Sequence, residues 1–574
     1  MTTPPRPHRN PEPAGWPERL ALLAVLVAAA WLRLDRVGFG LPALNDPDEP
    51  LFMMTAFDML RNRTFNPGWF GHPGTVTLYC LAAVMVIMGA LGMLTGRFDG
   101  VDGFASAVFA DPSIVFLPAR LLIVVFGVAC VLLTYAIGRR LWGPRAGLCA
   151  AALLGVNALH IEYSQVIRTD VQASALMLLC VLASLSILDH GRRREYVLAG
   201  LLLGLACATK WPAAAIALSP ICAGLARRDY RMTGVLLVVS VVTLLAVSPF
   251  LLLDHATLLR DLAGEARPAH PGATGSGLFG NLAAYAGGPL LASFGLPALL
   301  LALAGAVGAV WQDRRWRLAV APGFLLFAVL IAGQHLIWDR WLVPILPFFA
   351  LSAAWALDQI LRHLPLRLQA YGGPVAVAAL VVLIVPMVSE ARMTAAERRN
   401  DTRQIASAWV RANVPPGSSI VLEHGALDLL DGPWALRFPL GSAGCIDPRA
   451  TLSGKISARQ VERQRTGRAV VDLGHIDASE VAGCRADFAV LSHLARYEAE
   501  AEKHPEPLQR YRELVAGGDL VARIEPLHGK RGGPTILIYR LVGNAGAPRK
   551  SEPGPGGTDA GLPTLPTFVR PIIA

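Results

Sequence analysis

Long apolar runs, repeated along most of the chain, constrain this sequence more than any other feature. A run of about 20 residues is long enough for a helix to cross the hydrocarbon core of a membrane. Of the 574 residues, 53% are hydrophobic and 16% are charged, against about 25% charged in ordinary soluble domains. A polytopic membrane protein is therefore predicted. The runs begin near Leu20, Leu121, Leu148, Val171, Val235, Leu299, Leu318, Leu342 and Val375.

The positive charges lie mainly between the apolar runs. The formal net charge is +10, but the arginines form short clusters rather than one basic face, which argues against nucleic acid as a partner. Arginine between spans is typical of cytoplasmic loops. The clusters predicted to be cytoplasmic are Arg139, Arg140 and Arg145; Arg192 to Arg194; Arg227, Arg228 and Arg231; Arg314, Arg315 and Arg317; and Arg362 and Arg367.

This charge rule predicts a topology in the cytoplasmic (inner) membrane. Residues 1–17 form a cytoplasmic tail, residues 18–38 cross outward, and residues 39–73 form the first outer loop. A crossing by residues 75–95 would carry the first arginine cluster outside, so this stretch is predicted to be a re-entrant or interfacial segment. The membrane domain, residues 18–391, then has about 11 transmembrane helices and leaves the C-terminal part outside.

The composition changes after the last apolar run. Residues 392–542 carry more charge and are predicted to form a small extracytoplasmic α/β domain, followed by a disordered, Gly- and Pro-rich tail at 543–574. Helical spacing occurs at 402–412. The predicted fold is thus an all-α polytopic membrane domain with a small C-terminal α/β domain. Strand patterns occur at 419–422, 487–491, 520–524 and 535–539.

The 8 cysteines separate into two groups. Cys445 and Cys484 stand alone in the polar C-terminal region and are predicted to form a disulfide, since that region is placed in an oxidising compartment. The others lie in apolar runs, where cysteine is usually a packing residue, and they show no metal-ligand spacing, so no metal site is predicted from them. These are Cys80, Cys130, Cys149, Cys180, Cys207 and Cys222.

The first outer loop carries the most informative polar residues. Asp46, Asp48 and Glu49 lie within four positions, directly after the first apolar run and before the apolar helical stretch 51–60. Such a cluster is compatible with a plain solvated loop. Carboxylates at a membrane surface can also accept the proton of an attacking hydroxyl or amine, which glycosyl transfer requires.

At this loop the sequence resembles the lipid-linked-sugar glycosyltransferases of the GT-C fold, in particular the protein O-mannosyltransferase and aminoarabinose transferase superfamily. Asp48-Glu49 followed by Phe52 is similar to the acidic motif in the first loop of that family. The sequence from Gly71 to Gly74, followed by Leu78-Tyr79, resembles its H/K-P-P-L-Y element. It departs from that element at Gly74, which replaces the second proline, and the Leu-Tyr pair comes three residues late.

Further elements resemble the family in the same order along the chain. Ser164–Asp170 (SQVIRTD) resembles its second acidic element, and Gly204–Pro212 (GLACATKWP) its G-L-a-x-x-T-K-y motif. Trp338–Ala350 (WDRWLVPILPFFA) resembles the late R-Y-x-L-P-x-x-P-F element, with Trp341 at the usual tyrosine. The stretch Gly533–Arg540 resembles the ending of many bacterial members.

The resemblance implies transfer of a sugar from a polyprenyl-phosphate donor to a glycan, lipid or protein acceptor at the outer membrane face, with inversion. Asp48 is the expected base, Glu49 orients it or the sugar, and Asp170 is a further catalytic candidate. Cations stabilise the phosphate that leaves. The candidate phosphate-binding residues are Lys210, Arg340, Arg168 and His72.

Each cation also has a structural interpretation. Arg168 can pair with Asp170, Lys210 can cap carbonyls at a helix break, Arg340 can pair with its neighbour Asp339, and His72 can serve a turn. The sequence identifies no certain cofactor. A divalent cation bridging the carboxylates of the two acidic motifs stays open, although no His or Cys spacing requires one.

Two other classes of protein remain as alternatives. A transporter or lipid-linked sugar flippase also has many helices and intramembrane charge, but it places ionisable residues near the bilayer midplane, whereas the charges named above lie at predicted helix ends. A non-catalytic membrane scaffold does not explain the ordered motifs. The sugar, the acceptor, the oligomeric state and the role of the C-terminal domain are not encoded in a pattern that the sequence reveals.

Overall fold

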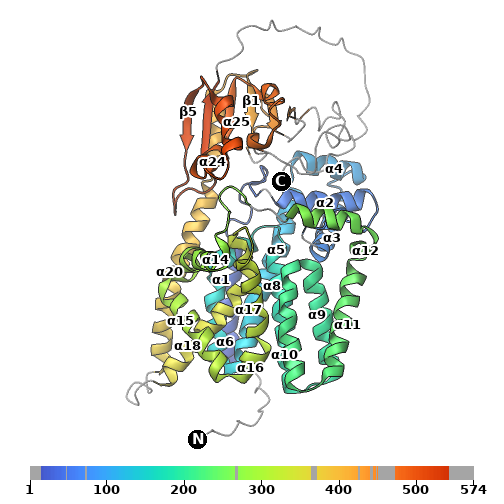
Figure 1. The fold of residues 1–574 in the computed structure, drawn as a ribbon, viewed down its shortest axis with the longest axis vertical. Helices are drawn as coiled ribbons and strands as arrows, with labels where there is room; N and C mark the ends of the chain where they lie inside the picture. Colours follow the sequence, from blue (N-terminus) through green and yellow to red (C-terminus); the bar gives the residue numbers. More distant parts are fainter. Residues whose placement is uncertain are drawn as a thin grey trace. The chain divides into compact units, whose positions relative to one another are not determined.

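The computed structural model describes most of the chain and divides it into two compact units (Figure 1). We call them the helical unit and the sheet unit. The described residues are 15–46, 48–71, 74–265, 269–363, 372–423, 427–439, 444–447, 449 and 472–541. The helical unit comprises Met1–Val37, Ala56–Ala110 and Ile114–Ala395; the sheet unit comprises Gly38–Thr55, Asp111–Ser113 and Ala396–Ala574. Three predicted features lie outside the described residues: residues 1–14 of the cytoplasmic tail, His72, and the disordered tail at 543–574.

Helices make up the helical unit (Figure 1). In chain order they are α1 (Trp16–Leu34), α2 (Glu49–Arg61, whose first turns belong to the sheet unit), α3 (Thr75–Leu94), α4 (Gly100–Ala110), α5 (Ser113–Trp142), α6 (Pro144–Gly155), α7 (Ala158–Ser164), α8 (Asp170–Asp189), α9 (Arg193–Thr209), η1 (Trp211–Ala217), α10 (Leu218–Ala226), α11 (Tyr230–Val247), α12 (Phe250–Leu253), α13 (His255–Glu265), α14 (Gly277–Tyr285), η2 (Ala286–Leu290), α15 (Leu291–Gln312), α16 (Arg314–Ala319), α17 (Ala321–Ala332), η3 (Asp339–Ile345), α18 (Leu346–Arg362) and α20 (Gly372–Arg399).

The chain is a membrane protein. Among the described residues, seven helices are long and apolar enough to cross a membrane, and the pair α6 and α7, bent by 64° at its break, is an eighth if it is one span. The predicted single segment 147–163 is therefore two helices. The count of about 11 crossings stays a prediction. Residues 75–94 form one continuous apolar helix, α3, and its re-entrant placement stays a prediction as well.

Small residues allow the helices of this unit to approach closely. Helix α9 packs against α11, and Gly200 and Gly204 lie on the contacting face. A Cβ atom at Gly204 would lie 2.6 Å from the carbonyl oxygen of Ser240. Small residues four apart are the usual means by which membrane helices pack without a hydrophobic driving force. The glycine of the Gly204–Pro212 motif therefore serves helix packing.

Replacing Gly204 by valine should destabilise the helical unit by about 1–3 kcal/mol, because the added atoms overlap the backbone of α11. Gly234→Val is the matched control, since Gly234 is also helical but a Cβ there meets nothing within 4 Å. Thermal unfolding of both variants in detergent measures the difference. Equal melting temperatures would show that the α9–α11 contact is looser than described.

The sheet unit is built on a mixed sheet with strand order β3-β2-β1-β4-β6-β5. Strand β1 pairs in parallel with β2 and β4, while the β2–β3, β4–β6 and β5–β6 pairs are antiparallel. The four predicted strands are present as β1, β4, β5 and β6; the sequence did not reveal β2 and β3. The bounds are β1 Ser419–Leu422, β2 Ala435–Pro439, β3 Cys445–Ile446, β4 Phe488–Leu491, β5 Asp519–Ile524 and β6 Ile536–Arg540.

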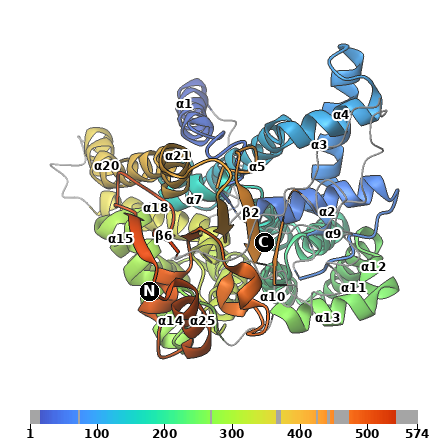
Figure 2. The ribbon, with the colours of Figure 1, turned by 90° about the horizontal axis from the view of Figure 1, so that it is seen from above.

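Helices cover both faces of this sheet (Figure 2). Helix α21 (Thr402–Asn413) packs on the face that carries Ile420, and helix α25 (Pro505–Val515) packs with α24 (Leu494–Ala499) on the face that carries Val421. Successive strand residues point to opposite faces, so the alternation along β1 fills two cores. The unit is therefore a three-layer α/β/α arrangement.

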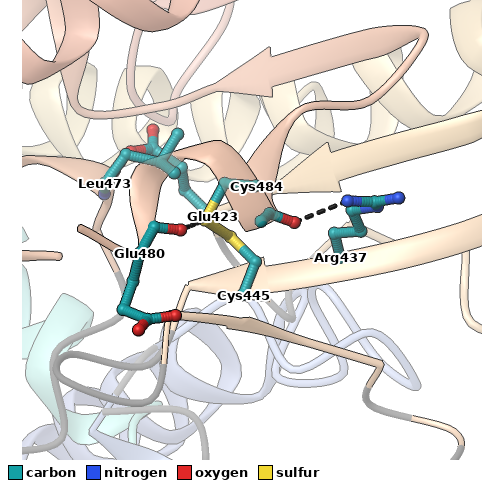
Figure 3. The surroundings of a disulfide bond; sticks show 7 residues. Glu423, Arg437, Cys445, Leu473, Glu480 and Cys484 are labelled. Carbon is teal, nitrogen blue, oxygen red and sulfur yellow. Dashed lines mark hydrogen bonds between the residues drawn. A yellow bond between two sulfur atoms is a disulfide. The ribbon is translucent and has the colours of Figure 1, made fainter. Parts of the chain in front are cut away.

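A disulfide joins Cys445 and Cys484, the pair expected from the sequence (Figure 3). Their Cα atoms are 5.0 Å apart, within the range that disulfides require. The bond links the edge strand β3 to the short helix η6 (Val481–Cys484). Close by, Arg437 on β2 donates to the carbonyl oxygen of Gly483 at 2.5 Å. Both contacts hold the segment before β4 against the edge of the sheet.

Candidate functional site

A buried ion pair lies at the centre of the helical unit's candidate site. Asp170 is the first residue of α8, and Lys210 directly follows α9, which packs against α8. The ammonium group of Lys210 donates to Oδ1 of Asp170, and the two residues are only 2% and 3% exposed. Pro212 at the start of η1 ends the helical hydrogen bonding of α9. This break turns the lysine toward Asp170.

The energetics of this pair decide how it is interpreted. Burying two charges costs several kcal/mol per ion, and their attraction often only offsets that cost. An apolar pair of similar volume would stabilise the fold equally well. A buried Asp–Lys pair is therefore better explained by a requirement for charge at this place than by stability.

Two arginines add positive charge around the same carboxylate. Both Arg168 and Arg340 act electrostatically on Asp170. Arg168 lies in the turn before α8 and is 7% exposed. Arg340 lies in η3, and its guanidinium group is 4.7 Å from the ring centre of Trp338. Together with Lys210 they concentrate cationic side chains at one place, the arrangement that binds phosphate.

Phe70 and Gly74 contact the residues on either side of the buried lysine. The indole nitrogen of Trp211 donates to the carbonyl oxygen of Phe70 at 3.3 Å, and the amide of Gly74 donates to the carbonyl oxygen of Thr209 at 3.2 Å. These bonds hold Phe70 and Gly74 against Thr209 and Trp211, the two neighbours of Lys210 in the chain. The second and fourth motifs recognised in the sequence therefore come together, although His72 itself lies outside the described residues.

Gly74 explains a departure from the family pattern. It has a φ of 58°, a left-handed conformation that proline cannot adopt because its ring fixes φ near −65°. The helix α3 begins directly after it, and Thr77 in its first turn donates to the side chain of Gln172 on α8 at 2.6 Å. The glycine thus brings the start of α3 to the start of α8.

The acidic loop belongs to the sheet unit, and its three carboxylates have different surroundings. Oδ1 of Asp46 accepts the amide hydrogens of Asp48 at 3.0 Å and Glu49 at 3.3 Å. Asp46 therefore acts as a cap for α2. Glu49 is fully buried, and Asp48 is half-buried. Asp48 is thus the more accessible carboxylate of the expected pair.

The predicted site residues are thus distributed over two units. The structure brings Asp170, Lys210, Arg168 and Arg340 together in the helical unit. Asp48 and Glu49 belong to the sheet unit. No group of three or more His, Cys, Asp or Glu side chains suited to a metal ion occurs in the part of the chain that the structure describes.

Arg33 on α1 is 0% exposed and was not among the residues that the sequence singled out. Its guanidinium group donates at 2.9 Å to the carbonyl oxygens of Ala29 and Gly155 and to Nδ1 of His160, and at 3.3 Å to the hydroxyl of Ser164. It thereby caps the end of α6 at the break before α7. Arg33 lies in the last turn of α1, where arginine at the end of a membrane helix usually reaches the interface, so the sequence carries no signal of its burial.

The contacts of Arg33 bear on the candidate site. Ser164 begins the Ser164–Asp170 motif, and the next residue, Gln165, donates to the carbonyl oxygens of Arg33 and Asp35 at 2.8 and 2.6 Å. Because arginine is only a donor, Nδ1 of His160 accepts, so the ring is neutral with its proton on Nε2. Arg33 therefore fixes the segment that leads to the buried ion pair.

A second buried carboxylate, Glu423, lies in the sheet unit at the end of β1. It accepts amide hydrogens from Leu473 at 3.2 Å, Ser492 at 2.6 Å and His493 at 3.0 Å, and the hydroxyl of Tyr511. Burial alone lowers the pKa of His493, but the hydrogen bond to Glu423 and its charge outweigh that effect and raise the pKa above 6.5. Glu423 thus joins the ends of β1 and β4 to α25.

The stability of the sheet unit should therefore depend on pH. Since the folded state raises the pKa of His493, the protonated ring contributes stability that is fully present below pH 6.5 and is lost as the pH rises through the raised value. The pH dependence is measured as the difference in thermal midpoint between wild type and His493→Gln. Unfolding of the sheet unit within the full chain is monitored by limited proteolysis. A difference that stays constant between about pH 5 and 9 would contradict it.

Comparison with known proteins agrees with the motifs. Residues 103–253 match the family model "Dolichyl-phosphate-mannose-protein mannosyltransferase". A search of curated proteins gives no match. The fold is similar to that of ArnT from Cupriavidus metallidurans in the apo state, with a TM-score of 0.50, 17% identity, and coverage of 92% of this chain and 99% of that one.

A second solved structure shares the fold. It is the oligosaccharyltransferase of Archaeoglobus fulgidus tethered to an acceptor peptide that contains the NVT sequon, with a TM-score of 0.51, 14% identity, and coverage of 87% of this chain and 72% of that one. At these identities the likeness shows the fold alone. With the family match, it confirms the resemblance to the GT-C glycosyltransferases that the motifs indicated.

Removing one member of the buried pair should be far more harmful to stability than removing both. Lys210→Met leaves a buried, unpaired carboxylate and should cost about 3–5 kcal/mol, whereas Lys210→Met with Asp170→Asn should recover much of that loss. Lys503→Met, which removes a lysine with a half-exposed side chain, is the control. Thermal unfolding in detergent measures all three. A double variant as unstable as the single one would contradict the pairing.

Proposed function

We propose that this chain is an integral membrane glycosyltransferase. It transfers a sugar from a polyprenyl-phosphate donor to a glycan, lipid or protein acceptor at the outer face of the cytoplasmic membrane. The observation that supports this most is the buried Lys210–Asp170 pair with Arg168 and Arg340 beside it, in a fold shared with ArnT. The arginine clusters between spans support a cytoplasmic N-terminus and an extracytoplasmic sheet unit.

The reaction requires cations where the leaving group develops charge. The acceptor oxygen or nitrogen forms a bond to the anomeric carbon, and the bond from that carbon to the phosphate oxygen breaks. Polyprenyl phosphate leaves with increased negative charge. Lys210, Arg168 and Arg340 supply positive charge that is already fixed in a water-poor place, so little reorganisation is needed during the reaction.

The reaction also requires a base for the acceptor proton. Asp48, half-buried and at the start of α2, accepts that proton, and the buried Glu49 orients the site. General-base catalysis of this kind contributes about 10²- to 10⁴-fold. Because the acceptor attacks as the phosphate departs, a single displacement inverts the anomeric carbon.

The alternative of a transporter or flippase is less well supported. Such proteins place ionisable residues on broken helices near the bilayer midplane. Here Asp170 is the first residue of α8, Lys210 directly follows the end of α9, and Arg340 lies in the turn before α18. Charges at helix termini on one side of the unit suit chemistry at the membrane surface.

Two substitutions separate the two roles. Asp48→Asn keeps the shape of the side chain but cannot take the proton, so the chemical step should slow by about 10²- to 10⁴-fold while donor binding persists. Arg340→Met should weaken donor binding and turnover together, because the same contact strengthens as charge develops. Transfer kinetics and polyprenyl-phosphate binding by the purified proteins measure both effects.

Gln509→Ala is the control for these measurements, since Gln509 is exposed on α25 and bonds only to Glu513 among the described residues. It should behave as wild type. Near-normal transfer by Asp48→Asn and Glu49→Gln in folded protein would contradict the assignment of the acidic loop and return the transporter class to consideration.

A further inference from the structure

The sheet unit includes the acidic loop, although the two are far apart in the sequence. Residues 38–55 group with residues 396–574 rather than with the helices that flank them. The guanidinium group of Arg398 lies 4.6 Å from the ring centre of Phe39, near the start of this loop. The loop that carries Asp48 is therefore part of the same compact body as the C-terminal sheet.

Asn45 is the point at which the loop is held. Its side-chain amide donates to Oε1 of Gln404 at 2.8 Å, and Nε2 of Gln404 donates back to Oδ1 of Asn45 at 2.6 Å. The guanidinium group of Arg403 donates to the backbone carbonyl oxygen of Asn45. Asn45 is only 1% exposed. We call these three residues the amide clamp.

The clamp is itself held rigidly at the start of α21. Asp401 accepts two bonds from the side chain of Arg403, at 2.8 and 2.7 Å, and caps the helix through the amide of Arg403 at 2.9 Å. The paired bonds fix the plane of the guanidinium group. The third guanidinium nitrogen of Arg403, Nη1, is therefore presented to the loop in one orientation.

The C-terminal motif supports the same helix start. The amide of Thr402 donates to the carbonyl oxygen of Gly532 at 2.9 Å, and its hydroxyl donates to that of Pro534 at 2.6 Å. A Cβ atom at Gly533 would lie 2.6 Å from Oδ1 of Asp401, so only glycine fits there. Residues 532–534, just before β6, thus hold the start of α21, which carries two residues of the clamp.

From the clamp, a short covalent path leads to the expected base. Asp46 follows Asn45 directly, and its carboxylate caps α2 by accepting the amides of Asp48 and Glu49. Fixing Asn45 therefore fixes the first turn of α2. A catalytic group displaced by about 1 Å can lose on the order of 10²-fold in rate.

We propose that α21 of the sheet unit positions the acidic loop for glycosyl transfer, and that Asn45, Arg403 and Gln404 are positioning residues of the reaction. The sheet unit then has a positioning role for the expected base, Asp48, which belongs to the same unit. The effect on rate rests on the function proposed above, whereas the effect on the loop does not.

The test compares Gln404→Ala and Asn45→Ala with the exchanged pair Asn45→Gln and Gln404→Asn, which rebuilds two facing amides of the same total length. Gln509→Ala is the control in the same unit. Hydrogen exchange of residues 38–46 reports the order of the loop. Transfer kinetics with a polyprenyl-phosphate sugar report kcat and the KM for the donor. All proteins are full-length.

The single variants should exchange faster at 38–46 and lose about 10- to 100-fold in kcat, with the donor KM changed less than about twofold. The exchanged pair should recover much of both. Unchanged exchange, or faster exchange with a normal kcat, would overturn the proposal. If one single variant fails to fold, the other and the exchanged pair decide. Absence of transfer by wild type would contradict the proposed function only. Hydrogen exchange alone would then test whether the amide clamp orders the loop.

Discussion

The ion pair between Asp170 and Lys210 is the interaction around which the candidate site of the helical unit is organised. A buried carboxylate and a buried ammonium each need the other, because either alone would remain uncompensated away from water. The pair holds the start of α8 to the end of α9, and the bonds of Trp211 and Thr209 to the segment around His72 add the start of α3. Residues of three motifs that are distant in the sequence therefore lie around this pair.

The supporting contacts have a common feature: polar side chains bind protein groups where a helix begins or ends. Arg33 satisfies carbonyl oxygens where α6 ends before α7, Lys210 lies at the break after α9, and Asp46 caps the first turn of α2. Irregular backbone in a membrane protein is tolerated only where it is satisfied by protein groups or lines a water-filled space. Breaks of this kind are also where polar chemistry can be placed at a membrane surface. Both the satisfaction of the backbone and the proposed chemistry therefore require polar side chains at these positions.

Much of this arrangement follows from patterns within short stretches of sequence, and the rest does not. The apolar runs, the α21 helix and strands β1, β4, β5 and β6 have local periodicity, which is why they were predicted. Strand β3 has two residues and β2 ends in a proline, too little signal for a strand. Asp170 and Lys210 were both named, but their partnership joins residues 40 positions apart. The bonds between Asn45 and Gln404 span 359 positions, and no local pattern encodes them.

The proposed activity is consumption of a polyprenyl-phosphate sugar at the outer face of the membrane. The most direct measurement is the amount of that lipid accessible from outside in cells that lack the chain, compared with cells that carry it. We expect a polyprenyl-monophosphate sugar to accumulate on the outer face and to disappear when wild type, but not Asp48→Asn, is restored. An unchanged amount of this lipid, or accumulation confined to the inner face, would contradict the proposed activity.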